Sequence, residues 1–61
     1  MNGEAFTKKL ESLSYDTALL NSEIIRTREG LHRSIQIIKE TDDPEETHQK
    51  LLALKKELDS R

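Results

Sequence analysis

The chain contains no cysteine and no tryptophan, and one phenylalanine and one tyrosine are its only aromatic residues. The lack of cysteine excludes disulfide bonds, thiolate metal sites and a cysteine nucleophile. Only 33% of the 61 residues are hydrophobic, while 36% are charged. A lone hydrophobic core is marginal at this length, and few large side chains are present to fill it. We therefore expect part of the burial to come from self-association or from a partner helix.

Long hydrophobic runs and a strong charge of either sign are also missing. No apolar stretch approaches the ~20 residues that a membrane span needs, and the start, Met1-Asn2-Gly3-Glu4, lacks the basic and apolar segments of a signal peptide. The net charge of −2 gives no broad attraction to nucleic acid or to anionic lipid. These features predict a cytoplasmic protein with no membrane partner.

Proline is absent before position 44, and the segment that precedes it carries apolar residues at steps of three and four. This spacing predicts one long amphipathic helix over about residues 4–41. Its apolar face comprises Phe6, Leu10, Leu13, Leu20, Ile24, Leu31, Ile35 and Ile38. Residues 14–17 and Gly30 could interrupt it, but the spacing continues in phase through both, so one helix is favoured over a three- or four-helix bundle. A continuous helix predicts that Gly30→Ala stabilises the protein by about 0.5–1 kcal/mol.

One strong boundary signal occurs at Asp43-Pro44, followed by Glu45 and Glu46. Aspartate is a good N-cap, proline suits the first helical position, and acidic residues in the first turn favour the helix dipole. A second helix is therefore expected over about residues 44–60, with Leu51, Leu54 and Leu58 as its apolar stripe. The predicted fold is a single all-α domain over residues 1–61, an antiparallel helical hairpin that oligomerises into a helical bundle or coiled coil.

The two predicted arms are unequal, roughly 55 Å and roughly 25 Å long at 1.5 Å per residue. The short arm would cover Leu31 and Ile38 but would leave the first half of the long helix free. That uncovered half supplies the predicted partner-binding residues, Phe6, Leu10, Leu13, Thr17, Leu20 and Ile24. The sequence thus indicates a non-enzymatic protein-interaction or assembly module that packs on itself or on another helical protein.

Catalytic, cofactor-binding and metal-binding residues are not predicted. Glu29 with His32, and Glu45 with His48, repeat the Glu-x-x-His spacing of di-metal bundles, but Glu29 and His32 fall outside the predicted core seam. A basic cluster, Arg26, Arg28, His32 and Arg33, is interpreted as a solvated face. Two alternatives remain: a small helical regulator or co-chaperone that docks on a folded partner, and, less favoured, a nucleic-acid-binding helical dimer that uses the basic cluster.

Overall fold

Four helices make up the part of the chain that the structure describes. The computed structural model describes residues 2–61, with side-chain environments from Phe6 onward. The helices are α1 (Asn2–Glu11), α2 (Tyr15–Ile24), α3 (Arg28–Glu40) and α4 (Pro44–Asp59), and no strand occurs among these residues. The all-α class is therefore confirmed. Among the described helices, none combines the length and apolarity required to cross a bilayer.

The long helix predicted over residues 4–41 is wrong, because the chain leaves the helical conformation twice. Ser14 has an extended ψ of 161°, and its hydroxyl accepts a hydrogen bond from the Thr17 N–H at 3.2 Å. Thr27 has a ψ of 154°, and its hydroxyl accepts from the Gly30 N–H at 2.9 Å. Each hydroxyl serves as an N-cap for the helix that follows, which offsets the helical bonds lost at the break.

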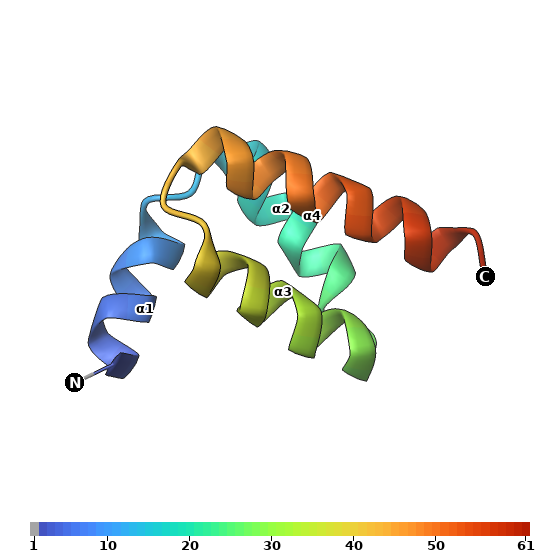
Figure 1. Cartoon of the computed structure of the whole chain (residues 1–61), viewed down its shortest axis with the longest axis horizontal. Helices are drawn as coiled ribbons and strands as arrows, with labels where there is room; N and C mark the ends of the chain where they lie inside the picture. Colours follow the sequence, from blue (N-terminus) through green and yellow to red (C-terminus); the bar gives the residue numbers. More distant parts are fainter. Residues whose placement is uncertain (1) are drawn as a thin grey trace.

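The last helix begins where the sequence predicts and ends one residue earlier. Asp43 adopts the extended N-cap conformation, and its carboxylate accepts from the Glu45 N–H at 3.3 Å, while Pro44 opens α4. Helices α3 and α4 run side by side in opposite directions, joined by residues 41–43 (Figure 1). The predicted pair of helices is thus replaced by four, of which α3 and α4 form one antiparallel pair.

The core lies between α2 and α4, with α3 closing it. Leu20 and Ile24 on α2 and Leu51 and Leu54 on α4 are buried together. The partly buried side chains of Ile37, Leu52 and Leu58 pack around them. The breaks make this arrangement possible, because a straight helix would carry Leu20 and Ile24 beyond the reach of α4 in the same chain.

Hydroxyl side chains extend the core into a polar layer. Thr17, Ser34, Thr41 and Thr47 are all buried. The Ser34 hydroxyl donates to the Asn21 side-chain oxygen, which joins α3 to α2, and Thr41 bonds Thr47 at the start of α4. Within the described residues, no buried side-chain nitrogen or oxygen lacks a hydrogen-bond partner. The polar layer is therefore compatible with burial.

Helix α1 packs on α3 away from the core (Figure 1). The Lys9 ammonium donates to the Lys39 carbonyl at 3.1 Å, and the Lys39 ammonium lies 6.0 Å from the centre of the Phe6 ring. Phe6, Leu10 and Leu13 are half-buried. Helix α1 thus covers the C-terminal half of α3, where Ile38 is buried.

Candidate interaction surface

Three of the six predicted partner-binding residues are buried inside the chain. Thr17, Leu20 and Ile24 lie on the inner face of α2, with exposed fractions of 3%, 8% and 2%. Their partner is α4 of the same molecule, so no surface remains on them for another protein. The prediction placed them on a free arm because it assumed a continuous helix.

The other three, Phe6, Leu10 and Leu13, lie on α1 and its C-terminal edge and are half-buried. They belong to the side of the molecule where α1 packs on α3. Ile38 is buried, as the sequence predicts. Leu31, which was also expected to lie under the last helix, is 40% exposed, because α4 packs on a different side of α3.

The main uncovered apolar surface lies on the opposite side of α2. Tyr15 is 79% exposed, Leu19 52% and Ile25 39%, and Ala18 is also exposed. Tyr15 and Leu19 are four residues apart, so they share a face one helical turn apart, while Leu20 and Ile24 point to the opposite side. We call Tyr15, Ala18 and Leu19, together with Ile25 at the C-cap of α2, the outer α2 face; the exposed Ser22 lies between Leu19 and Ile25.

Sequence reasoning missed this face, although a signal for it is present. The regular spacing of Leu20 and Ile24 assigned one apolar stripe to the region, and the Tyr15–Leu19 pair falls out of phase with that stripe. A helix that is apolar on two opposite sides usually contacts something on both. In this molecule only the inner side of α2 is covered.

Two carboxylates border the outer α2 face. Asp16 and Glu23 are exposed and lie seven residues apart, which places them on one flank beside Leu19 at 3.6 residues per turn. The ion pairs of the described residues include neither of them. The apolar face is thus edged on one side by negative charge.

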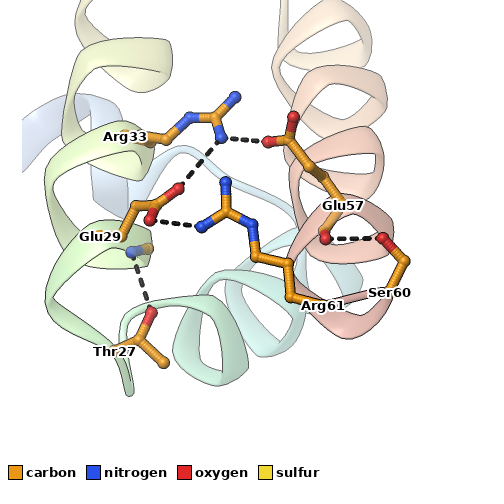
Figure 2. A network of polar contacts seen from close by, with 7 residues as sticks. Thr27, Glu29, Arg33, Glu57, Ser60 and Arg61 are labelled. Carbon is orange, nitrogen blue, oxygen red and sulfur yellow. Dashed lines mark hydrogen bonds and ion pairs between the residues drawn. The ribbon is translucent and has the colours of Figure 1, made fainter.

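The predicted basic cluster is partly neutralised by a network between α3 and the end of α4 (Figure 2). Arg33 pairs with Glu29 at 3.5 Å and also with Glu57, and Arg61 donates to Glu29 at 2.6 Å. The Arg61 hydrogen bond lowers the pKa of the Glu29 carboxyl; desolvation of the carboxyl opposes this effect, and Arg33 adds to it. Glu57 and Arg61 are distant in sequence, so the spacing of residues 26–33 gave no sign of these pairs.

The imidazole of His48 is bound to α2 rather than to an acidic neighbour. Its Nδ1 lies 2.7 Å from the Thr17 hydroxyl, which lies 2.9 Å from the Ser14 hydroxyl. Since Thr17 is buried, this chain of polar groups ties the start of α2 to α4. A shallow hollow of about 350 Å³ lies beside it, lined by Ser14, Asp16, Thr17, Pro44, Glu45, His48 and Gln49.

The two Glu-x-x-His spacings do not form a metal centre within the described part of the chain. Glu29 is engaged by two arginines, and His48 by Thr17. No group of three or more potential ligands of the His, Cys, Asp and Glu type converges among the described residues. The outer α2 face is therefore the strongest candidate for an interaction surface, because its large apolar side chains are not covered by the rest of the chain.

Comparisons with known proteins identify no relative of this chain. No protein-family model matches the chain, no curated protein matches it, and no solved structure matches it.

Proposed function

We propose that this protein is a non-enzymatic interaction module that binds an amphipathic helix of another protein on its outer α2 face. The supporting observation is that α2 carries apolar residues on two opposite sides. The inner side packs on α4, while Tyr15, Leu19 and Ile25 are among the most exposed large hydrophobic side chains of the molecule.

The chemistry of the partner is suggested by the flank of this face. Asp16 and Glu23 are exposed and belong to none of the described ion pairs, so a helix with Lys or Arg beside its apolar stripe would complement them. Within the chain, Asp59 raises the pKa of Lys55 and the charge of Glu23 adds to this effect, so Glu23 already has one cation of α4 nearby. Tyrosine is a good anchor for such a contact because it buries a large area while its hydroxyl remains hydrated.

The alternative of nucleic-acid binding is less well supported. Arg33 and Arg61 are engaged by Glu29 and Glu57, which leaves fewer free cations to neutralise phosphates. Acidic Asp16 and Glu23 on the adjacent helix would oppose a polyanion. A small regulator that docks on a folded partner remains compatible with the proposal, provided that the partner presents a helix.

Titration with two synthetic amphipathic helices tests the proposal. Both peptides have the same leucine stripe, one flanked by lysine and the other by glutamate. We expect the lysine peptide to shift the backbone amide NMR signals of α2 and to bind more tightly than the glutamate peptide. Equal affinities would contradict the role of Asp16 and Glu23, and the absence of shifts on α2 would contradict the proposed face.

A matched pair of variants separates apolar packing from general charge attraction. Leu19→Glu adds a negative charge within the outer α2 face, and Ala53→Glu adds the same charge at an exposed position of α4. Both should keep the native circular dichroism spectrum. We expect Leu19→Glu to abolish binding of the lysine peptide and Ala53→Glu to retain it; if Leu19→Glu binds at least as tightly as the parent, the contact is electrostatic and the proposed surface is wrong.

A further inference from the structure

The connection between α2 and α3 has the properties of a hinge. It spans only residues 25–27, and its backbone is extended at Thr27, with φ −106° and ψ 154°. Ile25 has φ −75° and ψ 3°, which is already close to helical. None of the described residues here has a positive φ, so nothing in the backbone prevents α2 and α3 from joining into one helix.

At Leu31 the apolar pattern of the sequence fits a joined helix better than it fits the bent form. In a straight helix over residues 15–40, Leu31 falls on the same face as Leu20, Ile24 and Ile38, because these positions keep steps of seven and four. In the bent form Leu31 is 40% exposed, whereas the other three are buried. Straightening would therefore align every large apolar side chain of this seam.

Gly30 fits the bent form because it has no side chain. A Cβ atom added there would collide with the Ile24 carbonyl oxygen and would lie only 2.8 Å from the Thr27 hydroxyl. Gly30 is also buried, in the first turn of α3. In a straight helix the same position tolerates any ordinary residue, and alanine is preferred over glycine there. The bent corner therefore depends on a glycine that the straight helix does not need.

From these observations we propose that the groove of α3 and α4 binds the α2 helix of a second copy of this chain when the hinge straightens. Helices α1 and α2 of each copy then pack on α3 and α4 of the other, and Leu20 and Ile24 enter the same core from the partner molecule. Exchange of this kind keeps the core contacts while it changes only the hinge, which makes it a low-cost route to a dimer. The proposal does not depend on the outer α2 face.

Gly30→Ala provides the first test, because alanine is excluded from the bent corner and allowed in the straight helix. We expect the variant to be helical by circular dichroism and dimeric by light scattering at concentrations where the parent is monomeric. The matched control is Gly3→Ala, the same change at the other glycine, which lies in α1. A Gly30→Ala protein that is folded and monomeric would overturn the proposal.

Crosslinking distinguishes exchange from side-by-side association. The natural chain lacks cysteine, so cysteines placed at Thr17 and His48, whose side chains bond each other at 2.7 Å, are the only thiols available for a disulfide. In the parent background we expect an intrachain disulfide, and in the Gly30→Ala background a covalent dimer on a non-reducing gel. A dimer whose disulfides are all intrachain would overturn the proposal.

Thr27→Ala provides a second test, which applies even if Gly30→Ala does not fold. This change adds no atom to the corner, but it removes the acceptor of the Gly30 N–H and so weakens the bend. Each dimer straightens two hinges, so loss of a cap at both should raise the dimerisation constant by roughly 30-fold. If the interchain disulfide fraction of Thr27→Ala does not exceed that of the parent at any concentration, exchange through this hinge does not occur.

Discussion

Neighbouring isoleucines at the end of α2 allow a direct test of which face of this helix is buried within the chain. Ile24 is 2% exposed and packs with Leu20, Leu51 and Leu54, whereas Ile25 is 39% exposed. Truncating a buried isoleucine to alanine removes transfer free energy and leaves a cavity, which together cost about 2–5 kcal/mol. A surface truncation usually changes stability by less than about 0.5 kcal/mol. Ile24→Ala should therefore be far more destabilising than Ile25→Ala.

The size of this protein decides how the measurement is made. A chain of 61 residues has a total stability of roughly 3–9 kcal/mol at ordinary values per residue. Ile24→Ala could remove most of it, so Ile24→Val, with an expected cost of about 0.5–1.5 kcal/mol, provides a variant that stays folded. Urea denaturation followed by circular dichroism gives the free energy of unfolding of each of the three variants, for comparison with the parent. Equal shifts for Ile24→Ala and Ile25→Ala, or loss of association without loss of stability in Ile24→Ala, would refute the four-helix packing and favour a free long helix.

Two further predictions concern polar groups at helix ends. Because Arg61 lowers the pKa of Glu29 in the folded state, the stabilisation from this pair is present at neutral pH and is lost as the pH falls below 4.5 through the folded pKa. Glu29→Gln should therefore lower the urea midpoint at pH 7 and should match the parent in acid. Because the pair is exposed, the difference at pH 7 should be smaller in high salt. A difference from the parent that stayed constant at all pH values would show that the ion pair is not its cause. Asp43→Ala should cost about 1 kcal/mol, because the first turn of α4 loses its acceptor, and an unchanged thermal midpoint would show that the cap contributes nothing.

The two proposed interactions differ in what is bound, a foreign helix in one case and a second copy of the chain in the other. The outer α2 face would bind a foreign helix without any change in the hinge, and hinge exchange would bind a second copy without using that face. Leu19→Glu should therefore block the peptide and leave the yield of interchain disulfide unchanged. Thr27→Ala should leave peptide binding unchanged and raise the yield of interchain disulfide. A single variant that removed both activities would indicate that α2 itself had lost its fold.

Features that the sequence determined by itself are those with local causes. The start of α4 was predicted correctly because Asp43 and Pro44 act within one turn, through a side-chain acceptor and a missing N–H. The all-α class followed from apolar spacing, which is a property of short windows. Such signals do not depend on what the rest of the chain contacts.

The tertiary structure alone decided where the first helix breaks and which side of α2 is covered. The hydroxyl caps at Ser14 and Thr27 are each worth only about 1 kcal/mol, so the nearby sequence does not fix whether the helix breaks there. Within one molecule, burial of Leu20 and Ile24 against α4, worth several times that amount, requires the bent form. Gly30 permits this form, because a Cβ there would collide with the Ile24 carbonyl. The same packing exposes Tyr15 and its neighbours, since a helix that buries one side must present the other.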